Sequence, residues 1–225
     1  MSVLTPELRE RADQIIAKYP NSRSAVLPLL FLVQSVEGHL TEEGMHEVAD
    51  ILNLTPAQIL AAASFYTMLK KQPQGTYLIS VCRNIACTHV GGRELIKSLE
   101  KHLRIKAGQT TRDGHFSLEA AECLATCDGA PSMQINYEDF YNVTAESAIE
   151  LIEKLMAGEE VRSVRGEIVK DSKQIAGEIA IAGLQLPHGD MGEMRTIGGE
   201  SPRADTAPGF RPKVHGEEGT EDAGD

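Results

Sequence analysis

Four cysteines are the residues of this 225-residue chain whose type and spacing could do chemistry. They form two pairs, Cys82 with Cys87 and Cys123 with Cys127, with four and three residues between the members. Neither pair has the C-x-x-C spacing of a thioredoxin-type redox dithiol. Four thiolates suit either structural zinc or an iron–sulfur cluster. The number and spacing of the cysteines therefore predict that they bind a metal ion or a metal cluster.

The spacing of the pairs favours two irons over one zinc. Zinc sites hold their cysteines around one tetrahedral ion, most often in two C-x-x-C pairs. A binuclear cluster places two cysteines on each iron and needs loops open enough to wrap the bridging sulfides. The observed spacings fit the 2Fe-2S cluster better, while zinc and unligated thiols remain alternatives. His89 would be half of a Rieske site, but no histidine follows the second pair, so an ordinary loop residue is predicted there.

Each cysteine pair is predicted to follow a strand. Residues 76–81 form a β-prone run that leads into Cys82, and residues 115–119 alternate like a strand before Cys123. Two loops at the same edge of a sheet would bring the four thiolates together. The other elements predicted in this half are a helix at 92–104, a strand at 132–136 and a helix at 144–158.

The front of the chain is predicted to be helical. Apolar residues recur there with the helical period, and Thr5 with Pro6, Thr41 and the Thr55 capping box mark helix starts. Pro73 and Gly75 interrupt the pattern. The predicted domains are a helical bundle at residues 1–72 and an α/β domain at residues 75–160.

Residues 161–225 are predicted to be a largely disordered acidic, glycine-rich tail. Only one aromatic residue, Phe210, lies in this segment, so little apolar burial is available to offset the entropy of ordering. Residues 175–186 are its one apolar stretch. Docking of that stretch on a partner is the alternative to disorder.

Charge and hydropathy exclude several classes of function. The formal net charge is −11, which disfavours nucleic acid and anionic membrane surfaces as partners. The longest apolar run, residues 25–33, contains Pro28 and is too short to span a bilayer. The first residues show no secretory signal, so a reducing cytoplasmic setting is expected, in which thiols stay reduced.

Two strings around the cysteines carry a resemblance to a known family. VCRNIACTHVGG at 81–92 and ECLATCDGAPSMQIN at 122–136, with a matching helical front end, resemble the thioredoxin-like 2Fe-2S subunit of respiratory complex I, which is the E subunit of NADH:quinone oxidoreductase. The resemblance covers about residues 20–158. It implies an α+β fold, in which a helical bundle precedes a thioredoxin-like 2Fe-2S ferredoxin domain.

The resemblance also implies a function and a ligand set. One 2Fe-2S cluster would have Cys82 and Cys87 on one iron and Cys123 and Cys127 on the other. The chain would be an electron-transfer subunit of an oxidoreductase, beside the F subunit, which binds FMN and NADH, and other peripheral-arm subunits. Its place would be cytoplasmic, peripheral to the inner face of the cell membrane. No G-x-G-x-x-G follows a predicted strand, which agrees with flavin and NADH sites in the partner.

Two rival functions stay open at this point. A diaphorase unit of an NAD-dependent formate dehydrogenase or NAD-reducing hydrogenase uses a similar module. A zinc-stabilised interaction module belongs to a different class.

Two residues near the cysteines lead to hypotheses about the cluster's potential. Arg83 follows the first cysteine and would tune the potential through its charge. Thr126 stands where the family pattern leads us to expect a small apolar residue. Its hydroxyl would add a hydrogen bond near a sulfur and shift the potential slightly.

Overall fold

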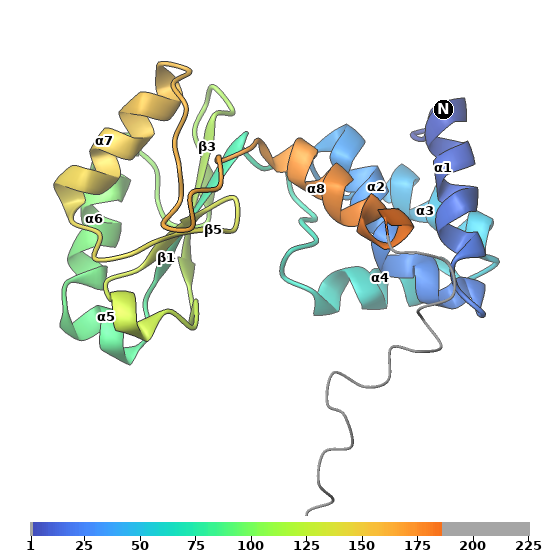
Figure 1. The fold of residues 1–225 in the computed structure, drawn as a ribbon. Helices are drawn as coiled ribbons and strands as arrows, with labels where there is room; N and C mark the ends of the chain where they lie inside the picture. Colours follow the sequence, from blue (N-terminus) through green and yellow to red (C-terminus); the bar gives the residue numbers. More distant parts are fainter. Residues whose placement is uncertain (1, 186–225) are drawn as a thin grey trace, which may run out of the picture. The chain divides into compact units, whose positions relative to one another are not determined.

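The computed structural model describes residues 2–185, and its helical part is built around one apolar helix. Helix α2 buries residues on nearly every side, among them Leu29, Leu30 and Val33. It ends where Gly38 adopts φ +81°, a left-handed conformation that glycine reaches without strain. The helices of this part are α1 (Pro6–Ala17), η1 (Ser22–Ala25), α2 (Val26–Glu37), α3 (Glu42–Leu52), α4 (Pro56–Phe65), α8 (Ser172–Ile181) and η3 (Ala182–Gln185) (Figure 1).

Three helices of the structure begin at the threonines that the sequence marked as caps. The Thr5, Thr41 and Thr55 side chains each accept a hydrogen bond from a backbone N–H in the first turn of α1, α3 and α4. Gln58 completes the capping box of α4. These bonds satisfy N–H groups that have no partner inside the helix, which is why each helix begins there.

Residues 161–185 correct the prediction of a largely disordered segment from residue 161. Helix α8 folds back on the bundle and packs along α2, with Ala176 and Ala180 buried in the same apolar core. Its small residues allow close approach to α2, so the helix buries apolar area that composition alone does not reveal. The alternative prediction, docking of residues 175–186 on a partner, stays a prediction, and residues 186–225 lie outside the described residues.

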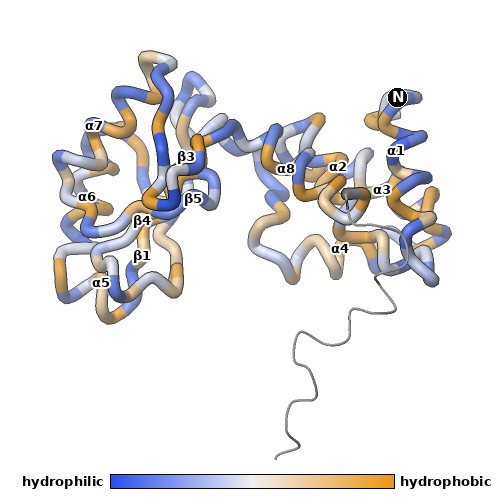
Figure 2. Tube along the Cα trace, viewed as in Figure 1, coloured by the Kyte–Doolittle hydropathy of each residue, from blue (hydrophilic) through white to orange (hydrophobic). Residues whose placement is uncertain are grey.

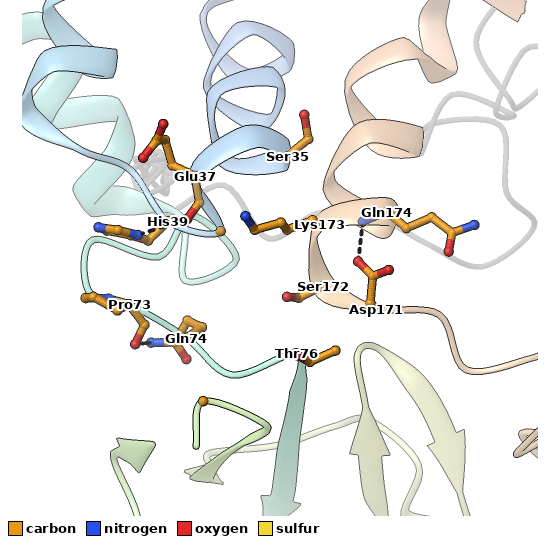
Figure 3. Close-up of a pocket in the computed structure, with 12 residues that line it drawn as sticks. Ser35, Glu37, His39, Pro73, Gln74, Thr76, Asp171, Ser172, Lys173 and Gln174 are labelled. Atoms are coloured by element: carbon orange, nitrogen blue, oxygen red, sulfur yellow. Dashed lines mark hydrogen bonds between the residues drawn. The ribbon is translucent and has the colours of Figure 1, made fainter. Parts of the chain in front are cut away.

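Polar contacts fix the start of α8. Asp171 caps the helix by accepting a hydrogen bond from the Gln174 N–H at 2.8 Å. Figure 3 shows these residues lining a pocket, with the Lys173 side chain extended toward the end of α2. The Lys173 Nζ donates to the Val36 carbonyl at 2.7 Å. A cation at this position also suits the negative end of the α2 dipole.

The sheet has five strands in the order β2-β3-β1-β4-β5. Strands β1 and β3 are parallel, and the other neighbouring pairs are antiparallel. The strands are β1 (Tyr77–Cys82), β2 (Gln109–Thr110), β3 (Phe116–Ala121), β4 (Met133–Ile135) and β5 (Glu138–Phe140). The sequence predicted β1, β3 and β4 but missed β2 and β5, because strands this short carry too few residues to show a period.

Helices α6 (Gly92–Leu103) and α7 (Ala145–Met156) cover one face of the sheet (Figure 1). Leu95 and Leu99 from α6 and Ile152 from α7 share a core with Ile79 and Val81 of β1. A separate core fills the helical part, and Figure 2 shows apolar residues in both parts. The predicted α+β class, with a helical region before a sheet domain, is confirmed.

Within residues 2–185 no single helix is long and apolar enough to cross a membrane, and only the bent pair of α3 and α4 meets that length and composition together.

The packing of α8 on α2 leads to a paired stability prediction. A Cβ on Gly177 of α8 would meet only the Ser35 side chain, at 3.6 Å, whereas a Cβ on Gly44 of α3 would overlap the Val33 side chain. We expect Gly177→Ala to raise the free energy of unfolding by about 0.4–1 kcal/mol. Gly44→Ala should lower it by about 1–3 kcal/mol. Urea unfolding measures both, and equal losses would contradict the placement of α8.

Candidate metal centre

The two cysteine loops leave the sheet at the same edge. Cys82 is the last residue of β1 and lies opposite Ala121, the last residue of the parallel strand β3. The carboxyl ends of parallel neighbours meet at one edge, so the loops after β1 and β3 start side by side. Cys123 follows β3 by two residues. The predicted placement of both pairs after strands is confirmed.

The remaining cysteines lie in short helical segments. Cys87 belongs to α5 (Ile85–His89), and Cys127 begins η2 (Cys127–Gly129). Asn84 starts α5 by accepting a hydrogen bond from the Ile85 N–H at 2.7 Å. Neither segment is predicted from the sequence, since each is shorter than two turns and shows no apolar period.

The four thiols are close enough to influence one another electrostatically. The pKa of Cys127 is raised, first by partial desolvation and then by the charges of Cys123, Cys87 and Cys82. The Cys87 side chain is also one of the groups that lower the pKa of Cys82. Among residues 2–185, no group of three or more His, Cys, Asp or Glu side chains is arranged so that it could hold a metal ion.

The first pair is buried and the second is exposed. Cys82 and Cys87 are only 3% and 1% accessible, whereas Cys123 and Cys127 lie at the surface. Burial opposes ionisation of Cys82, but backbone N–H groups of Asn84 and Leu124, with the Cys87 and Ser132 side chains, lower its pKa below the ordinary value. These donors favour the thiolate, which is the form that binds metal.

Ser132 is a site residue that the sequence does not reveal. Its hydroxyl lies 3.5 Å from the Cys87 Sγ and is almost fully buried. Its carbonyl accepts a hydrogen bond from the Cys82 N–H at 3.2 Å. One residue just before β4 therefore positions both cysteines of the first pair. No spacing rule connects Ser132 to the cysteines, because the link runs across the sheet.

Two other residues singled out in the sequence lie at the surface of this site. Arg83 forms an ion pair with Glu122, the residue before Cys123, so its charge is shared with a carboxylate. Its tuning role stays a prediction. His89 ends α5 and is exposed. The pocket of Figure 3 contains none of the four cysteines among its lining residues.

A family model described as thioredoxin-like [2Fe-2S] ferredoxin matches residues 12–156. The chain belongs to this family. The match covers both cysteine pairs and most of the helical region before them, which confirms the predicted family and its cofactor, one 2Fe-2S cluster. The donor set agrees, because four thiols in two pairs supply two ligands for each of two irons.

Relatives of the chain are named as oxidoreductase subunits. The E subunit of NADH-quinone oxidoreductase from Mycobacterium tuberculosis is 41% identical over 182 residues, which are 81% of this chain and 71% of the relative. NADH-quinone oxidoreductase subunit 2 of Thermus thermophilus is 35% identical over 155 residues, 68% of this chain and 86% of the relative. These names confirm the predicted oxidoreductase and NADH dehydrogenase assignment at the level of the family.

A solved structure of an NAD+-reducing [NiFe]-hydrogenase is also similar. It has a TM-score of 0.53 and 28% sequence identity, and the alignment covers 59% of this chain but 23% of the hydrogenase chain. The fold is thus also found within a larger chain of another redox enzyme.

Gly92 leads to a prediction about the first cysteine loop. A Cβ at this position would lie 2.8 Å from the Cys87 carbonyl oxygen and 2.9 Å from that of Cys82, both backbone atoms. We expect Gly92→Ala to displace this loop, to lower the free energy of unfolding by about 1–3 kcal/mol and to reduce the iron content. Iron and acid-labile sulfide assays measure the loss. Gly177→Ala is the control, and equal iron contents in the two variants would contradict the prediction.

Proposed function

We propose that this chain is the electron-transfer subunit of the NADH-oxidising module of respiratory complex I. In this proposal Cys82 and Cys87 bind one iron of the 2Fe-2S cluster, and Cys123 and Cys127 bind the other. The observation that carries it is the pairing of β1 with β3, which starts both cysteine loops at one edge of the sheet. The names of the relatives support the choice of complex.

When bound, a 2Fe-2S cluster accepts one electron and passes it on. The residues of this chain hold it and set the environment in which it does so. The buried first pair keeps one side of the site dry, and the N–H donors around Cys82 compensate negative charge on the sulfurs. None of the four thiols acts as an acid, a base or a nucleophile in this role.

An exposed apolar surface beside Cys87 supports contact with a partner protein. Ile85 is 71% exposed and Val90 is 53% exposed, at the two ends of the segment that holds the buried Cys87. When a partner covers apolar side chains this exposed, their removal from water stabilises the complex. We assign this surface to the F subunit of the complex, which in our proposal carries FMN and NADH close to the cluster, at the inner face of the cell membrane.

A second candidate function rests on the hydrogenase similarity. In that case the same site would serve a diaphorase unit that exchanges electrons with NAD. Purification of the assembled complex from its native source separates the two. Proton-pumping membrane subunits support complex I, and a nickel–iron or molybdenum subunit supports the alternative.

Replacement of the cysteines tests the cluster itself. The purified full chain should contain two irons and two acid-labile sulfides and should give a 2Fe-2S EPR signal after reduction with dithionite. Each Cys→Ala change should abolish that signal, because no fifth cysteine can replace a ligand. His89→Ala is the matched control and should retain it. A colourless protein with one zinc and no signal would instead support the zinc-stabilised interaction module.

A further inference from the structure

One buried hydroxyl beside the cysteines has no hydrogen-bond partner. Among residues 2–185, only the Thr126 Oγ1 and the Ser163 Oγ are buried side-chain oxygen or nitrogen atoms without a partner. Thr126 is 9% accessible and lies directly before Cys127, within the loop that begins at Cys123. A buried hydroxyl without a partner costs about 1–3 kcal/mol, so its presence needs an explanation.

Helix capping does not explain the position of Thr126. It precedes the first residue of η2, where a threonine usually accepts a backbone N–H, but its side chain makes no capping bond. By contrast, Thr144 caps α7, and Thr5, Thr41 and Thr55 cap their own helices. Thr126 is thus an N-cap threonine whose hydroxyl stays available for another group.

The surroundings of Thr126 indicate which group that is. The cysteines at the two ends of its loop belong to the set of four mutually interacting thiols. The Ala125 N–H, one residue earlier, already donates to the Cys123 Sγ at 3.4 Å. Thiolates and sulfides accept hydrogen bonds, and a hydroxyl can donate one.

We propose that the Thr126 hydroxyl donates a hydrogen bond to a sulfur of the 2Fe-2S cluster and thereby raises its reduction potential. This inference rests on the proposed function, since it requires the cluster to be held by the four cysteines. Reduction adds one electron and no counter-charge, so the sulfurs become more negative. A donor therefore stabilises the reduced state more than the oxidised state.

The test compares the reduction potentials of full-length chains that carry their cluster. Thr126→Val removes the hydroxyl at nearly constant volume, and Thr126→Ser retains it. In a redox titration followed by EPR, Thr126→Val should lower the reduced-to-oxidised ratio at a fixed applied potential by about threefold to tenfold. Tenfold corresponds to about 59 mV for a one-electron couple. Thr126→Ser should stay within about twofold of the unsubstituted chain on the same scale.

Two further measurements make the test specific. Ser163→Ala removes the other unpartnered hydroxyl, which lies in a segment without cysteines, and should leave the ratio unchanged. Pulsed EPR of the reduced protein after exchange into D2O should show deuterons coupled to the cluster, from backbone N–H donors such as Ala125 and from the Thr126 hydroxyl. Thr126→Ser should keep the full set of couplings, and Thr126→Val should lose one of them.

The outcomes separate this inference from the proposed function. An unchanged potential in a Thr126→Val chain with a full cluster overturns the hydrogen bond and leaves the ligand set intact. Thr126→Ala is the second variant if Thr126→Val does not assemble. Failure of both to hold a cluster also overturns the inference, because a tuning bond is not needed for assembly. An unsubstituted chain without iron would instead contradict the proposed function.

Discussion

The parallel pairing of β1 with β3 is the constraint on which the site depends. Parallel neighbours need a long crossover, which α5 and α6 begin, and they end at the same edge of the sheet. Strand pairing therefore brings together two cysteine pairs that are distant in the sequence, and no contact between their loops is needed for this. The apolar core between the sheet and its two helices holds this register, because a slip by one residue would turn Cys82 to the other face.

Burial divides the ligand set into two unlike halves. The first pair lies inside the domain, where an unpaired thiolate would be costly, and it is surrounded by N–H donors and by Ser132. The second pair lies at the surface, on a loop whose Thr126 hydroxyl has no protein partner among the described residues. The buried pair suits a rigid attachment for the cluster, and the exposed pair suits electron exchange with a partner protein. This asymmetry follows from tertiary position and not from ligand type.

Helix α8 gives residues after the sheet domain a structural role in the bundle. Its start is bonded to the segment that leads into β1, since Ser172 donates to the carbonyls of Gly75 and Thr76. Its buried alanines then complete the core around α2. Residues 161–225 taken together are acidic and glycine-rich, and this overall composition led to the prediction of disorder. The prediction was wrong for α8 because α2 is so apolar that covering it stabilises the fold even when the covering helix has only a small apolar face.

The sequence alone determined the elements whose signals are local. The threonine caps and the β-prone run before Cys82 depend on residues a few positions apart, and the structure contains each of them. The two cysteine pairs and their family also followed from sequence. Only the tertiary structure decided that Ser132 positions the first pair, that α8 covers α2, and that Thr126 is buried without a partner. These features arise from contacts between segments far apart in the chain, whose geometry no local pattern encodes.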